Sequence, residues 1–64
     1  MEDEGFVDDG FIEETAWGYA SLHGKDGVPM LRRLAAVAEQ AGDAVQAQTW
    51  RAIAEAAERI LAAG

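Results

Sequence analysis

The sequence LAAVAEQAGDAVQAQTW, residues 34–50, contains the signal that decides the fold. Apolar residues recur every three or four positions before and after Ala41-Gly42-Asp43, which is the spacing of one face of an α-helix. Gly42 favours the left-handed backbone that ends a helix, and Asp43 suits the cap that begins the next one. We therefore predict two helices that are joined by a tight turn and lie antiparallel.

The first of these helices is predicted to begin at Pro29, after a short loop at residues 25–28, and to run to about Ala41. Proline is tolerated there because a first helical turn needs no N–H at that position. The predicted apolar face consists of Met30, Leu31, Leu34, Val37, Ala38 and Ala41. The second helix is predicted to run to about Ala62. Its predicted apolar face consists of Trp50, Ile53, Ala57, Ile60 and Leu61, with the polar Gln46 interrupting the first turn.

A further helix is predicted to begin near Phe11, with Asp9 as its N-cap, and to end at His23-Gly24. Its predicted apolar face consists of Ile12, Thr15 or Ala16, Tyr19 and Leu22. Trp17 falls outside this face and is predicted either to be an exposed binding residue or to pack on the hairpin in a different helix register.

These patterns predict an all-α fold, a small three-helix domain in which a helical hairpin and an N-terminal helix occupy residues 11–64. Residues 1–10 are predicted to form an acidic N-terminal arm. A chain of 64 residues buries too small a share of its surface for high stability. Disulfides are excluded because the chain has no cysteine, so association is the remaining way to add burial.

The net negative charge resides in the first fifteen residues. Seven acids there accompany no Lys or Arg, whereas five acids balance five bases from Ala16 onward, so the formal charge of -7 belongs to one segment. The same segment contains Phe6, Val7, Phe11 and Ile12. Acids with apolar anchors are typical of a segment that docks on a basic surface. The alternative is that Phe6 and Val7 fold back as a helix staple and the acids are solvated.

The spacing of His23-Gly24, Pro29, Arg33, Ala41-Gly42-Asp43 and Trp50-Arg51-Ala52-Ile53-Ala54 resembles that of a family of short, uncharacterised helical proteins common in alphaproteobacteria. The shared pattern is His-Gly, then two helices divided by Ala-Gly-Asp, then Trp-x-x-Ile. The resemblance covers residues 17–54 and leaves out the acidic arm. It implies the helical fold and implies no activity.

Catalytic and metal sites are not predicted. Residues 8–12 resemble part of a calcium-binding loop, but Ala16 stands where calcium requires a bidentate Glu. His23 has no nucleophile on its own helical face, so we interpret it as a helix C-terminal residue that complements the dipole. We therefore expect no enzyme, no cofactor and no metal.

Four arginines, Arg32, Arg33, Arg51 and Arg59, offer three interpretations. They could contact phosphate in a DNA-binding helix-turn-helix. They could instead pair with Glu39, Glu55 and Glu58 on a solvated face, or receive the acidic arm of the same chain. We favour pairing, because a pI near 4.3 opposes affinity for nucleic acid and for anionic membranes. The acidic N-terminus differs from a basic signal peptide, so we expect a cytoplasmic protein.

The predicted function is therefore binding. We expect a non-enzymatic small acidic protein that binds a larger protein with a basic surface and inhibits or regulates it. Nucleic-acid-handling machinery is one such target, as for inhibitors of CRISPR complexes. The alternative is a structural helical module that self-associates as a homodimer or serves as a small subunit, and a DNA-binding regulator comes third. The predicted partner-binding residues are Glu2, Asp3, Glu4, Phe6, Val7, Asp8, Asp9, Phe11, Ile12, Glu13, Glu14 and Trp17.

Overall fold

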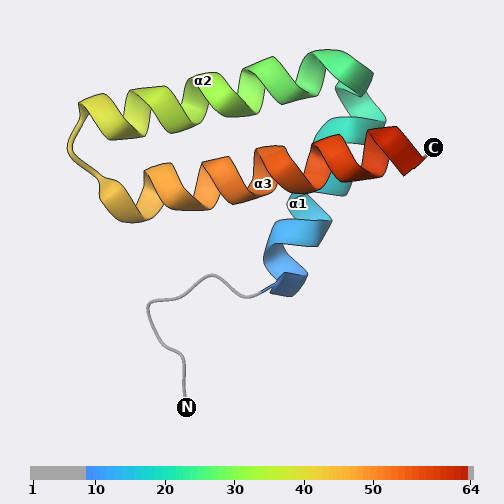
Figure 1. The fold of residues 1–64 in the computed structure, drawn as a ribbon, viewed down its shortest axis with the longest axis horizontal. Helices are drawn as coiled ribbons and strands as arrows, with labels where there is room; N and C mark the ends of the chain where they lie inside the picture. Colours follow the sequence, from blue (N-terminus) through green and yellow to red (C-terminus); the bar gives the residue numbers. More distant parts are fainter. Residues whose placement is uncertain (1–8, 64) are drawn as a thin grey trace.

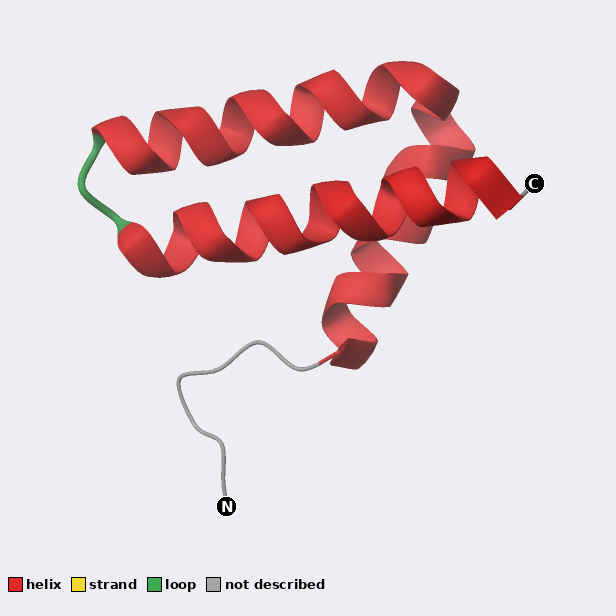
Figure 2. Ribbon diagram, in the orientation of Figure 1, coloured by secondary structure: helices red, strands yellow, loops and turns green. Residues whose placement is uncertain are grey.

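The fold is a helical hairpin crossed by an N-terminal helix, as the computed structural model shows for residues 9–63. The elements are α1 (Asp9–His23), the 3-10 turn η1 (Gly24–Asp26), α2 (Gly27–Gln40) and α3 (Ala44–Ala63). In Figure 1, α2 and α3 lie antiparallel, and α1 crosses the hairpin near the carboxyl end of α3. Figure 2 shows one loop, between α2 and α3, and residues 9–63 contain no strand. The prediction of an all-α fold is confirmed over these residues.

The turn between α2 and α3 is the one predicted from the sequence. Gly42 has a φ of +81°, in the left-handed region that L side chains disfavour. Its N–H donates to the carbonyl of Glu39 at 3.0 Å, and the N–H of Asp43 donates to the carbonyl of Ala38 at 2.9 Å. These two bonds form a Schellman motif. The N–H of Gln46 donates to Asp43 Oδ1 at 3.1 Å, so Asp43 is the N-cap of α3.

The prediction of three helices separated by two loops is wrong at the first loop. Residues 25–28 are helical, so residues 9–63 contain two continuous helical stretches, 9–40 and 44–63. The first stretch bends at Gly24, whose φ of +59° redirects the chain within one residue. The bend is tight because Gly27 lies against α1, where a Cβ would stand 3.0 Å from the carbonyl oxygen of Tyr19.

The start of α1 also differs from the prediction. Asp9 is the first residue of the helix and not the cap before it, and Gly10 is helical as well. A sequence pattern fixes a helix end only to within one or two residues, because the ends of helices fray. The predicted arm residues Glu2, Asp3, Glu4, Phe6, Val7 and Asp8 lie outside the residues that the structure describes.

The core is thin and rich in alanine. Its fully buried cluster consists of Ala16, Leu31, Ile53, Ala54, Ala56 and Ala57, and half-buried Ile12, Tyr19, Val28, Leu34, Trp50 and Ile60 pack around it. Leu31 and Ile53 are the largest side chains among the fully buried residues. Alanine lets the helix backbones approach closely, but each alanine buries little apolar area.

Four side chains predicted to lie on apolar faces are exposed instead: Leu22, Met30, Val37 and Ala41. These side chains are exposed because α1 packs mainly on α3, so that one edge of α1 and one edge of α2 have no neighbouring helix. The predicted polar interruption at Gln46 has a structural role. Its Oε1 accepts a hydrogen bond from the indole N–H of Trp50 at 3.3 Å, and the Trp50 ring meets Tyr19 edge to face at 6.4 Å.

Candidate functional site

The candidate site is organised around Trp17 on α1. Ala16 and Ala20 of this helix face the core, and the 3.6-residue period turns Trp17 away from it. The side chain is left 56% exposed. Tryptophan is usually well buried in a folded chain. An indole that is more than half exposed therefore marks a surface that can bury apolar area when a partner binds. The prediction that Trp17 lies outside the core face is therefore confirmed.

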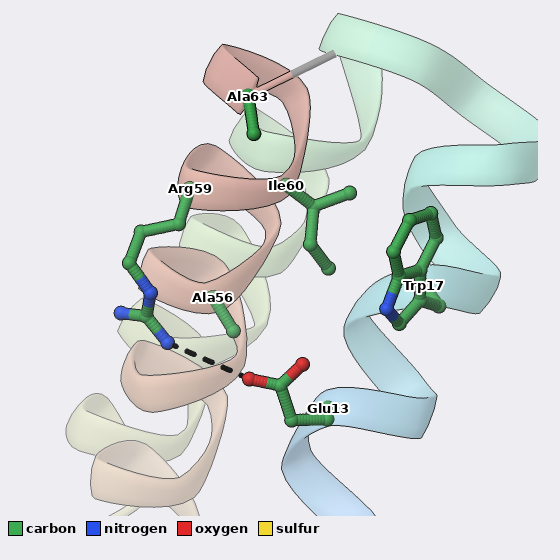
Figure 3. Close-up of a pocket in the computed structure, with 6 residues that line it drawn as sticks. All are labelled: Glu13, Trp17, Ala56, Arg59, Ile60 and Ala63. Atoms are coloured by element: carbon green, nitrogen blue, oxygen red, sulfur yellow. Dashed lines mark ion pairs between the residues drawn. The ribbon is translucent and has the colours of Figure 1, made fainter.

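A groove separates this part of α1 from α3. It has a volume of about 410 Å³ and is lined by Glu13, Trp17, Ala56, Arg59, Ile60 and Ala63. Figure 3 shows Trp17 and Glu13 projecting from α1, and Ile60 and Arg59 from α3. The two alanines of α3 leave room because their side chains end at Cβ. The groove thus has an apolar floor and one charge of each sign at its edge.

One ion pair crosses the groove, between Arg59 Nη2 and Glu13 Oε2 at 3.8 Å. The distance is too long for a good hydrogen bond. Both side chains are well exposed, at 68% for Arg59 and 53% for Glu13, so water and salt screen the attraction. Such a pair contributes little to stability. A cation from another molecule could therefore replace Arg59 at low cost.

The described members of the predicted contact surface do not all lie together. Glu13 and Trp17 share the groove, and Glu14 is exposed beside them in the sequence. Ile12 packs against the core cluster, so its predicted role as an anchor for a partner is not supported. Phe11 is 52% exposed but does not line this groove. The α3 side of the groove was not predicted, because Ala56, Arg59, Ile60 and Ala63 meet α1 only through the crossing of the two helices.

The predicted pairing of the arginines with Glu39, Glu55 and Glu58 is confirmed for two of the four, and Arg59 pairs with Glu13 of α1 instead. Arg32 donates to Glu58 Oε2 at 2.6 Å and Arg51 donates to Glu39 Oε2 at 2.7 Å, while Arg59 faces Glu13. The hydrogen bond and charge of Glu58 raise the pKa of Arg32, with a smaller contribution from Glu55. Among the lysines and arginines of residues 9–63 only Lys25 and Arg33 form no ion pair, which leaves little free positive charge for a phosphate backbone.

Other classes of site find no support in the part of the chain that the structure describes. No group of three His, Asp or Glu side chains there could hold a metal ion. His23 lies with its ring 5.9 Å from that of Tyr19, at the end of α1. None of the helices within residues 9–63 combines the length and the apolarity needed to cross a bilayer.

Comparison with known proteins adds no identification. Neither a protein-family model, nor a curated protein, nor a solved structure matches the chain. The resemblance to short alphaproteobacterial helical proteins stays a prediction, and any function must be argued from the surface described above.

Proposed function

We propose that this chain is a non-enzymatic binding module that docks on a basic protein through the α1 side of the Trp17 groove. The observation that carries the proposal is the exposed indole of Trp17, which shares its groove with Glu13 and lies about one helical turn from the exposed Glu14. Between Asp9 and Leu22 α1 contains acids and no Lys or Arg. The surface thus combines an aromatic anchor with charge of a single sign.

The anchor accounts for affinity. Tryptophan is among the residues that dominate binding energy at interfaces, and its truncation there typically costs about 2 kcal/mol or more. The groove beside Trp17 would receive an apolar or long aliphatic side chain, which Ile60 and Ala56 would contact from α3. The aliphatic stem of a lysine or arginine fits this description, since its apolar part can cover the groove while its charge meets Glu13.

The acids account for the kind of partner. A cation that approaches Glu13 competes with Arg59. The attraction between Arg59 and Glu13, 3.8 Å apart, is screened by water and salt. Glu14 is exposed and makes no ion pair within residues 9–63. The acids that precede α1 in the sequence add to the negative field that steers a basic surface toward α1. Binding would therefore weaken as the salt concentration rises.

Inhibition or regulation follows from the same chemistry. A basic surface on a nucleic-acid-handling protein binds phosphate through its lysines and arginines. An acidic helix that covers those side chains excludes the nucleic acid. This proposal requires no pocket for a substrate and no catalytic group on the chain.

The experiment is capture of a partner from a host lysate with the full chain, followed by titration of the purified partner. Three variants are compared with the parent: Trp17→Ala, Glu13→Gln with Glu14→Gln, and Glu55→Gln as a control that removes an exposed acid of α3. The first two should weaken binding at least about tenfold, and the control should not. Equal affinity for all four proteins would refute the proposal.

A further inference from the structure

A second hollowed surface lies elsewhere on α1, where this helix meets the start of α2. Leu22 projects roughly 140° around the helix from Trp17, at 3.6 residues per turn. Two adjoining hollows of about 460 and 550 Å³ share the side chains of Tyr19 and Met30. The first is lined in addition by Thr15, Gly18, Leu22 and His23, and the second by Asp26, Pro29, Arg33 and Leu34.

The apolar side chains of this surface are unusually open. Leu22 is 81% exposed and Met30 is 41% exposed. A single exposed leucine needs no explanation, but here Leu22, Met30 and the half-buried Tyr19 border the same concave area. Grouped apolar exposure of this kind marks contact sites in small proteins. We call the set Tyr19, Leu22, Asp26, Met30 and Arg33 the bend surface, because it surrounds the bend between α1 and α2.

The bend surface carries one charge of each sign. Asp26 and Arg33 line the same hollow, one at the end of η1 and one in α2. Within residues 9–63 neither forms an ion pair, although the arginines at 32, 51 and 59 all do. The two charges balance, in contrast to the acidic side of α1. The bend surface therefore presents a cation and an anion that no described part of the same chain neutralises.

We propose that the bend surface is the contact between two copies of this chain. In a two-fold symmetric dimer the same patch meets itself, so Asp26 of each copy can face Arg33 of the other across the axis. A patch that holds both signs side by side is complementary to its own two-fold image. The apolar centre, Leu22 and Met30, is then covered from both copies.

The thin core supports a second copy as the occupant. Within residues 9–63, Leu31 and Ile53 are the only large side chains that are fully buried. The other buried core residues are alanines. A domain of this size commonly gains its missing burial from association. A highly basic partner suits the Trp17 groove better, because Glu13 there already faces Arg59 and Glu14 adds a further acid, whereas the bend surface carries one acid and one base.

The first test is the molar mass of the full chain in solution, by light scattering and sedimentation. The parent should be a dimer at high micromolar concentration. Leu22→Glu should raise the dissociation constant on the order of 100-fold, because two leucines leave the interface and two charges enter it. Val45→Glu is the matched control: Val45 is also exposed but borders neither hollow, so the dimer should persist. A monomeric parent, or a dimer that Leu22→Glu leaves intact, would overturn the proposal.

The second test uses charge reversal to distinguish a two-fold dimer from any other assembly. Asp26→Arg alone, or Arg33→Asp alone, places like charges opposite one another at both junctions and should weaken the dimer. An equal mixture of the two variants should form a heterodimer, since both junctions then hold opposite charges. Mixing that fails to restore a dimer would refute the predicted juxtaposition, and an assembly larger than two would refute the closed symmetry.

Discussion

The turn glycine of the hairpin provides the sharpest test of how this small fold is stabilised. Gly42 has a φ of +81°, and a Cβ built on it meets no atom within 4 Å. Gly42→Ala therefore adds no steric clash with the rest of the protein. The cost is that of holding an L-residue in the left-handed region, about 1–2 kcal/mol. In a domain of this size, each kcal/mol of lost stability lowers the midpoint of thermal unfolding by about 4–8 °C.

Gly18→Ala is the matched control for this prediction. Gly18 lies in the middle of α1, and a Cβ there also meets nothing within 4 Å. Its backbone is helical, so alanine should stabilise the protein by about 0.5–1 kcal/mol through the lower entropy of the unfolded chain. The same chemical change is thus expected to have opposite signs at two open positions.

The assay is urea and thermal unfolding followed by circular dichroism. Both variants are placed in a Leu22→Glu background, because Gly18 borders the proposed dimer contact and dimerisation would make the midpoint depend on concentration. The reasoning is refuted if Gly42→Ala is neutral or stabilising. It is also refuted if Gly18→Ala destabilises the protein as much as Gly42→Ala does, since the backbone angle would then not be the deciding variable.

Three further predictions concern the cap, the core and the surface. Asp43→Ala should lower the free energy of unfolding by about 1 kcal/mol. Asp43→Asn should keep most of the parent's stability, since the amide oxygen can still accept from the N–H of Gln46. Urea unfolding of the two variants checks this. Leu31→Ala should cost about 2–5 kcal/mol, enough to unfold much of a marginal domain, and far-ultraviolet circular dichroism would show the loss of helix. Glu39→Gln should change stability by less than about 0.5 kcal/mol, because its pair with Arg51 is exposed; a larger loss in urea would contradict that estimate.

The hairpin could be predicted because its signals are local. The bonds at Gly42 and Asp43 join residues within five positions of one another, so glycine and aspartate at adjacent positions are enough to specify them. The end of α1 at His23, just before the positive-φ residue Gly24, is equally local. The close approach of Gly27 to the carbonyl of Tyr19, which accompanies the helical residues 25–28, could not be predicted, because it exists only once the chain has bent.

The candidate site could be predicted in part. The off-face position of Trp17 and the acids of α1 follow from helical periodicity and composition, but the partner wall of the groove does not. Ile60 and Arg59 stand opposite α1 because α1 crosses α3 near its carboxyl end. Nothing in the spacing of either helix specifies where along the other helix that crossing occurs.

The sequence by itself determined the helical content, the hairpin turn and the concentration of negative charge near the N-terminus, since each depends on neighbouring residues or on composition. The tertiary structure alone decided which apolar residues are covered. Leu22 and Met30 have the spacing of core residues, yet they remain exposed because α1 covers only part of the hairpin. Burial is a property of two elements in contact, and periodicity describes only one of them.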